Sequence, residues 1–453
     1  MTVKKPLSLL LTLLPPLLIL LLRPFGMDWL QGGILAALIL TIFWWVSGVV
    51  ERTLASSFLL LVFLLFSGAP VRSIFTFPLS ENFLMIVFSF LFSQGISNSG
   101  LTGKLLQPLL GRFARTPLRL LLSMVLSAFV MIFIIPQPFS RIIILSSIYA
   151  SYFDTLECVQ REKALKPILM AALFILSVLT NMLLLRGDII LNNALLTMGG
   201  ISMSEGAWMR YMTVPTAAFL SLATALFYLL FRKELTQYSG GVAGQQETLR
   251  LTSWEKKYLI LILAVVVFWA VEDLHGVSGT VTVAMGTALM FAVGLLRLPD
   301  CKSVNVKLLV FLTAAFAIGG VLKACGVADI LFSRFMVLFP SSFSWRYAVV
   351  VLLTAMLLHM VLGSNVTTMS VVVPGLMTIG AGVAPPVPLL LLIYIAVCGH
   401  FLLPFHHVVL LLGEGKGYYG SKHLARFGIP LTALMFLSAL LLYMGWWSAL
   451  SLL

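Results

Sequence analysis

The sequence predicts an all-α polytopic membrane protein with about eleven transmembrane helices in two inverted repeats, each with one re-entrant hairpin and one broken helix. Composition, long apolar segments and a repeated order of features predict this fold class. Of the 453 residues, 60% are hydrophobic and only 10% are charged, whereas a soluble domain carries about 25% charged residues to cover its surface. We therefore expect the chain to lie in a lipid bilayer.

Apolar segments between charged residues predict the transmembrane helices in order, because their lengths suit a hydrocarbon core about 30 Å thick. They cover residues 6–22, 28–46, 53–69, 80–98, 165–200, 207–231, 256–271, 278–298, 305–322, 385–412 and 427–450. The first segment follows Lys4 and Lys5 as in a signal peptide, but no small-residue cleavage site follows Leu22. We expect it to stay attached.

Two further apolar stretches, 118–153 and 346–383, carry a polar, Pro- or Gly-containing interruption at their middle. This pattern predicts hairpins that enter the membrane and leave by the same side. With a cytoplasmic N-terminus, that arrangement places most of the 29 Lys and Arg residues on the cytoplasmic side, as orientation rules require. If either hairpin crossed fully, the bias would collapse. The expected location is the cell membrane, with several crossings and the C-terminus outside.

A polar, glycine-containing stretch at 232–257 is the expected cytoplasmic linker between the two halves of the chain. The predicted organisation is N-terminal scaffold helices at 1–79, a first repeat at 80–231 and a second at 258–453. An apolar segment closes near Gly100 in one half and near Gly326 in the other, and Pro215 and Pro430 lie near the start of the last segments. The crossings counted between the copies give them opposite orientations, as in secondary transporters, whose substrate site lies near the midplane.

The predicted tip of the second hairpin is rich in small and polar residues. These are Gly363, Ser364, Asn365, Thr367, Thr368 and Ser370. Backbone at membrane depth leaves helical form only where it lines a protein cavity. There, side-chain oxygens can coordinate a small cation, and helix N-termini favour an anion. The alternative is ordinary close packing of helices through small residues.

The first hairpin carries Gln137 and Arg141 near its tip. An arginine at that depth costs a few kcal/mol unless it faces water, an acid or an anion. Its guanidinium group can bind a carboxylate, phosphate or sulfate at two points. We predict that Arg141 and Gln137 bind substrate. The alternative is that Arg141 reaches the membrane surface or pairs with Asp154.

Polar residues also interrupt the fifth and tenth predicted helices, at Thr180 and Asn181 and at His406 and His407. Histidine can carry a proton, donate to an anion or bind a metal. Adjacent residues on a regular helix point about 100° apart, so this pair does not form a metal site by spacing alone. We predict that all four residues contribute to the substrate site, with proton coupling or anion contact by the histidines; an inert polar break is the alternative.

Other polar residues receive structural interpretations. His359 and His400 lie in apolar surroundings and are expected to be packing histidines, and Arg186 is expected to form a local ion pair with Asp188, with substrate contact by Arg186 as the alternative. The four cysteines lack the spacing of a disulfide framework or zinc site. They are Cys158, Cys301, Cys325 and Cys398.

Several short motifs resemble the divalent-anion/sodium symporter family. They are Ser364-Asn365, the elements at Gly100 and Gly326, Leu403-Pro404 and Gly428-Ile429-Pro430. The resemblance implies eleven spans and two hairpins, a homodimer formed through scaffold helices, and an elevator mechanism. It also implies dicarboxylate, tricarboxylate or sulfate substrates, driven by sodium in many members. Each hairpin tip in that family carries Ser-Asn-Thr, which implies that Ser364 and Asn365 contact both sodium and substrate.

The sequence departs from the family pattern in both hairpins. Val366 replaces the usual Thr, and Pro136-Gln137-Pro138 replaces the first Ser-Asn-Thr motif. The first hairpin thus lacks the converging oxygens that a sodium site requires. A fixed charge on Arg141 is expected to stand in for a sodium ion there.

The predicted function is secondary active transport of an anion, because arginines and histidines within apolar segments, without acids at the hairpin tips, favour a positive cavity. Sodium is the only cofactor considered, and the net charge of +13 is assigned to cytoplasmic loops rather than to nucleic-acid binding. One alternative is proton-coupled or exchange transport, including that of an anionic lipid headgroup. Another is a membrane enzyme acting on a lipid-linked substrate, with His406 or His407 as base and Arg141 on a phosphate.

Overall fold

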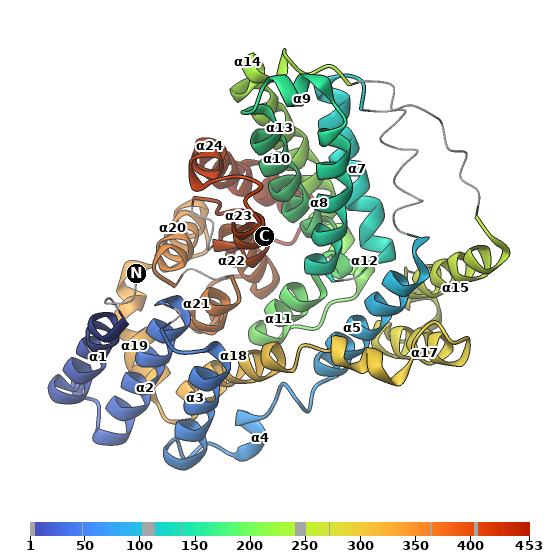
Figure 1. Ribbon diagram of the computed structural model, residues 1–453. Helices are drawn as coiled ribbons and strands as arrows, with labels where there is room; N and C mark the ends of the chain where they lie inside the picture. Colours follow the sequence, from blue (N-terminus) through green and yellow to red (C-terminus); the bar gives the residue numbers. More distant parts are fainter. Residues whose placement is uncertain are drawn as a thin grey trace.

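The computed structural model describes residues 5–47, 49–101, 114–135, 137–240, 251–270, 272–362, 365–402 and 406–453. Within these ranges all regular structure is helical, as the sequence predicts (Figure 1). Four of the described helices are long and apolar enough to cross a membrane, and shorter apolar helices of 10–17 residues accompany them. Part of the linker (241–250) and parts of both hairpin tips (Pro136, Gly363 and Ser364) lie outside the described residues.

The N-terminal region consists of three apolar helices that pack in sequence order, followed by a short helix and a fourth long one. They are α1 (Lys5–Leu22), α2 (Trp29–Ser47), α3 (Arg52–Phe66), α4 (Val71–Ile74) and α5 (Glu81–Ser99). The boundaries lie within a few residues of the predicted segments. Ser80 begins α5 by accepting a hydrogen bond from the Phe83 backbone N–H at 3.3 Å, as a helix N-cap does.

The rest of the first half forms a helical hairpin, a broken helix and a final long helix. The helices are α7 (Pro117–Ile134), α8 (Pro138–Asp154), α9 (Glu157–Arg161), α10 (Leu165–Thr180), α11 (Ile189–Gly199), α12 (Glu205–Trp208), α13 (Val214–Leu230) and α14 (Arg232–Leu235). α7 and α8 form the first hairpin. α10 and α11 are separated by 3₁₀ turns over Asn181–Leu183 and Leu185–Asp188, which we call the first break.

The second half repeats this order. Its helices are α15 (Ser253–Ala270), α16 (Glu272–His275), α17 (Gly279–Ala292), α18 (Val306–Ala324), α19 (Val327–Phe335), α20 (Trp345–Leu362), α21 (Asn365–Ile379), α22 (Pro386–Cys398), α23 (Val408–Gly415), α24 (Ser421–Ser438) and α25 (Met444–Ala449). α20 and α21 form the second hairpin. The second break separates α22 from α23 over residues 399–407, of which 403–405 are not described.

The two halves share local details and interlock. Gly100 and Gly326 follow α5 and α18 with φ of 67° and 75°, the left-handed conformation that ends many helices. α3 packs against α18, and α5 packs against α17, so each half contributes to two mixed helix pairs (Figure 1). A π-helical turn lies at each half's last long helix, at Met209–Thr213 and Ala439–Tyr443.

The first arms of the two broken helices form the centre of the protein. In α10 every residue from Ile168 to Thr180 is buried, and in α22 every residue from Pro388 to Cys398 is buried. A helix that is apolar all round requires burial on every side. The breaks that end these two helices are therefore enclosed by protein.

We predict that Gly428→Ala destabilises the protein. Gly428 lies in α24 against the second break, and a Cβ atom there would lie 2.0 Å from the Phe401 carbonyl oxygen. Overpacking of this kind typically costs about 1–3 kcal/mol, so the Tm of the detergent-purified protein should fall.

Gly445→Ala is the matched control, because Gly445 lies in α25 with no atom within 4 Å of an added Cβ. That variant should keep the original Tm or exceed it. Equal Tm values for the two variants would show that α24 does not press on the break.

Candidate functional site

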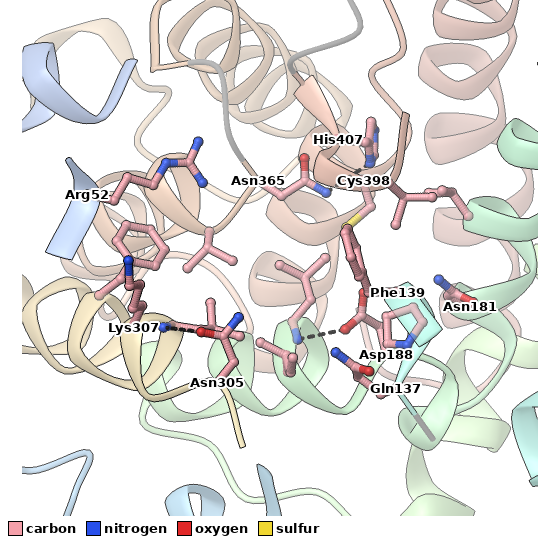
Figure 2. Close-up of a pocket in the computed structure, with 18 of the residues that line it drawn as sticks. Arg52, Gln137, Phe139, Asn181, Asp188, Asn305, Lys307, Asn365, Cys398 and His407 are labelled. Carbon is pink, nitrogen blue, oxygen red and sulfur yellow. Dashed lines mark hydrogen bonds between the residues drawn. The ribbon is translucent and has the colours of Figure 1, made fainter. Parts of the chain in front are cut away.

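A cavity of about 540 Å³ lies between α3 and α18 on one side and the hairpin tips and breaks on the other (Figure 2). Its size is typical of sites for small molecules. Its polar and charged lining residues are Glu51, Arg52, Thr53, Gln137, Asn181, Asp188, Asn305, Lys307, Asn365, Tyr394 and His407. The cavity therefore joins both halves of the chain and both groups of helices.

Six of the described helices begin at the cavity wall, namely α3 at Arg52, α18 at Val306 and four helices of the hairpins and breaks. These four are α8 at Pro138, α11 at Ile189, α21 at Asn365 and α23 at Val408. One of the first two residues of each lines the cavity. Because the first N–H groups of a helix lack intrahelical partners and carry partial positive charge, this arrangement favours a bound anion.

The first break leaves its helical backbone groups to be satisfied by side chains. The carbonyl oxygens accept from Trp208 Nε1 at Met182 (3.2 Å), from Thr213 Oγ1 at Leu183 (2.7 Å), and from Asn192 Nδ2 at Leu184 (3.2 Å) and Leu185 (3.0 Å). These donors come from α11, α12 and the π-helical turn before α13. The break is thus a fixed structure rather than a frayed helix end.

Arg141 ties the first hairpin to the first break. Its guanidinium donates to the Ile135 carbonyl oxygen at 2.7 Å, to Asn181 Oδ1 at 2.7 Å and to the Gly187 carbonyl oxygen. The side chain is 1% exposed and lies behind the lining residues. Arg141 therefore positions Asn181, and its own contact with substrate stays a prediction.

The suggested pair between Arg141 and Asp154 is wrong. Asp154 Oδ1 instead accepts from Lys166 Nζ at 2.5 Å, with 63% of its side chain exposed. Asp154 ends α8, whereas Arg141 lies in the first turn of that helix. About three turns of helix separate them, too far for an ion pair.

The expected local ion pair between Arg186 and Asp188 is also wrong. Arg186 Nε lies 3.3 Å from Glu205 Oε2, both side chains are buried, and the guanidinium lies 4.5 Å from the centre of the Trp269 ring. Residues two apart in a 3₁₀ turn point in different directions. Glu205, which the sequence analysis missed, also accepts from the backbone N–H groups of Leu185 at 3.1 Å and Arg186 at 3.2 Å.

Asp188 is a second residue whose role the sequence analysis missed. It lines the cavity beside Gln137 (Figure 2) and caps α11, with its Oδ1 accepting from the Leu191 N–H at 3.0 Å. An acidic residue directly before an apolar helical run is a helix-start signal. That signal places Asp188 at a helix end, but only the fold brings this end to the cavity.

The second hairpin contacts the second break as the first hairpin contacts the first. Asn365 Nδ2 lies 3.0 Å from His407 Nδ1, and His407 Nε2 lies 3.3 Å from the His400 carbonyl oxygen. The carbonyl can only accept, so His407 carries its proton on Nε2 and accepts from Asn365 on Nδ1. The amide orientation follows from this pairing.

The remaining predicted site residues fall into two groups. Gln137, Asn181, Asn365 and His407 line the cavity. Thr180, Thr367, Thr368 and His406 are buried and do not belong to the lining, and Ser364 lies outside the described residues. Thr180 Oγ1 donates to the Leu176 carbonyl oxygen at 2.6 Å, which accounts for its burial.

His359 and His400 are buried, as expected of packing histidines, and they pack against each other and against His406. Their Nδ1 atoms lie 3.3 Å apart, and both rings lie 4.6 Å, centre to centre, from the ring of His406. They are 41 positions apart in the chain. Only the packing of α20 against the end of α22 brings them together.

A helical membrane protein with two similarly ordered halves, whose hairpins and broken helices surround a polar cavity, has the construction of a secondary transporter. A family model described as "Sodium:sulfate symporter transmembrane region" matches residues 3–453. The chain belongs to this family, which confirms the resemblance to divalent-anion/sodium symporters. No curated protein sequence gives a significant match.

Family membership establishes the general class of activity, sodium-coupled transport of a small anion by a multi-pass membrane protein. Membership in a transporter family also argues against the alternative of a membrane enzyme.

We predict that Arg141→Lys lowers the Tm even though it keeps the positive charge. A lysine ammonium cannot reach the three acceptors that the guanidinium bridges, and each buried hydrogen bond lost from a charged group costs about 1.5–3 kcal/mol. Thermal unfolding of the purified protein measures the effect.

Arg119→Lys serves as control, because Arg119 is exposed in the first turn of α7. A Tm in Arg141→Lys equal to that of the control would mean that the guanidinium bridge does not hold the hairpin to the break.

Proposed function

We propose that the protein transports a small divalent anion, of the dicarboxylate, tricarboxylate or sulfate class, together with sodium and by an elevator-type movement. The observation that carries this proposal is the convergence of six helix N-termini on one cavity between two groups of helices. Each N-terminus contributes roughly half an elementary positive charge. An anion bound there gains this attraction in addition to that of Arg52 and Lys307, which also line the cavity.

Neutral polar side chains supply the specific contacts. Asn181 Oδ1 accepts a hydrogen bond from Arg141, so Nδ2 is the Asn181 group that can donate to a ligand, and that nitrogen lies on the cavity side (Figure 2). Gln137 and Asn365 offer further amide groups from the two hairpin tips. Amide and backbone N–H donors bind carboxylate or sulfate oxygens well in a site shielded from water.

Asp188 supports coupling to a cation. A carboxylate at an anion site opposes binding by about 4 kcal/mol for two unit charges 4 Å apart at an effective dielectric constant of about 20. Arg141 interacts electrostatically with Asp188 and offsets part of this repulsion. A sodium ion bound by Asp188 and Gln137 oxygens would remove the rest, because hard cations prefer oxygen ligands. Cation binding would then precede anion binding.

The origin of the lining residues supports the elevator movement. Arg52, Thr53, Lys307 and Phe311 come from α3 and α18, whereas the other wall is built from the hairpins and breaks. The hairpins and breaks are joined by the Arg141 and Asn365 hydrogen bonds. These elements can therefore move together past α3 and α18.

Uptake of labelled sulfate and succinate into proteoliposomes tests the proposal. We expect accumulation under an inward sodium gradient and little under a pH gradient alone. Accumulation driven only by the pH gradient, or only by an internal counter-anion, would favour the proton-coupled or exchange alternatives. No uptake of any soluble anion would contradict the proposal.

Asp188→Asn separates charge from structure, because Asn caps a helix as well as Asp does. We predict that the variant keeps its fold, binds the anion without sodium at least about tenfold more tightly than the original protein, since 1.4 kcal/mol of relieved repulsion gives this factor, and loses sodium dependence of uptake.

Asp154→Asn is the matched control, since Asp154 lies outside the cavity lining and is largely exposed. Unchanged sodium dependence in Asp188→Asn would remove Asp188 from the coupling step.

A further inference from the structure

Four of the six histidines in the chain lie in one buried cluster beside the cavity. His359 comes from α20, His400 follows α22, and His406 and His407 precede α23. All four side chains are at most 3% exposed. Three separate segments thus bring imidazole rings together in the interior, where apolar residues would pack at no polar cost.

Three of these histidines have the geometry of a metal site. Ligand nitrogens of His359, His400 and His406 all lie within 4.8 Å of one another. The Nδ1 atoms of His359 and His400 are 3.3 Å apart, and two imidazole nitrogens bound to one tetrahedral zinc ion at 2.0–2.1 Å are also separated by about 3.3 Å. His406 supplies the third nitrogen within the same 4.8 Å limit.

The hydrogen bonding of the His359 ring is incomplete among the described residues. His359 Nε2 is buried and makes no hydrogen bond to any described residue. The two facing Nδ1 atoms can form a hydrogen bond only if one ring carries its proton there. A metal ion between the two facing Nδ1 atoms would bind the lone pairs of both nitrogens and remove the need for a proton there.

We propose that His359, His400 and His406 form a binding site for a divalent transition-metal ion, with zinc the best fit and a fourth position open to water. Imidazole suits zinc, copper, nickel and iron, and zinc accepts three protein ligands in a tetrahedral site with one exchangeable position. The triad contains no carboxylate, so magnesium and calcium, which require oxygen ligands, are excluded.

The position of the triad assigns the metal a role distinct from the transported ions. His407 lies between the triad and the cavity: its ring centre is 6.3 Å from that of His359, and it lines the cavity beside Asn365. A metal ion on the triad would join α20 of the second hairpin to the second break. It would stabilise the wall that carries Asn365 and His407 without occupying the anion site.

Metal binding to the full-length protein tests this directly. The protein is purified in detergent through a tag without histidines, stripped with a chelator, and titrated with Co²⁺ and Zn²⁺. We expect one Co²⁺ per chain with the visible absorption of a tetrahedral complex, displacement by Zn²⁺, and a rise in Tm at metal concentrations about 100 times the Kd. A stripped protein that binds no stoichiometric metal would overturn the proposal.

His359→Gln should abolish the Co²⁺ spectrum and the metal-dependent rise in Tm. Glutamine keeps a similar volume and hydrogen-bonding capacity but is a poor zinc ligand. His423→Gln is the control, because His423 Nδ1 accepts from the Gly420 N–H at 3.2 Å at the start of α24, away from the triad. Equal metal binding in both variants would contradict the assignment.

X-ray absorption of the zinc-loaded original protein decides the case even if His359→Gln fails to fold. Three imidazole ligands and one oxygen ligand from water are expected, and fewer than three imidazoles would overturn the proposed site. Loss of metal binding in His359→Gln with sodium-driven anion uptake retained would separate this inference from the proposed function. An absence of anion uptake in every variant and in the original protein would contradict the proposed transport function but not the metal site.

Discussion

The need to satisfy backbone groups inside an apolar protein governs this structure. Each break removes hydrogen bonds from a helix whose first arm is buried on all sides, and an unpaired backbone group there costs several kcal/mol. Five side chains form hydrogen bonds with backbone groups of the first break: Arg141, Glu205, Asn192, Trp208 and Thr213. Because these partners come from four other elements, the polar interruption is also what holds the surrounding helices in place.

The two halves meet this need with different chemistry. The first break is held by charged groups, namely Arg141 and the Arg186–Glu205 pair, whereas the second is contacted by neutral groups, Asn365 and the imidazoles. Replacement of one partner in a buried ion pair costs more than loss of a neutral hydrogen bond. Replacement of a partner should therefore cost more at the first break than among the described residues of the second.

The sequence predicted the parts of this architecture that depend on local signals. Polar, Pro and Gly residues inside apolar stretches located the hairpins at 118–153 and 346–383, where the structure has α7–α8 and α20–α21, and placed Asn181 and His407 at breaks. It missed Glu205, Asp188 and the triad because each acts through contacts between separate segments. The Glu205 carboxylate accepts from backbone N–H groups 20 and 19 positions earlier in the chain. His359 contacts His400, which lies 41 positions later. Contacts between residues this far apart in the sequence cannot be predicted from the spacing of residues in a local motif.

The position of Arg141 explains how an anion site can be attractive and still release its ligand. A guanidinium in direct contact with a divalent anion in a dry cavity would bind it tightly and oppose release. Arg141 instead donates its hydrogen bonds to Asn181 and to backbone carbonyls. It affects the cavity by positioning Asn181 and through the electrostatic field of its charge. On the wall formed by the hairpins and breaks, the donors that face the ligand are then helix N-termini and neutral amides, each individually weak. Transport requires affinity for the anion on one side of the membrane and its release on the other. Many weak contacts meet both requirements better than one strong ion pair does. Some of these contacts would also depend on a cation near Asp188, so loss of that cation would weaken anion binding.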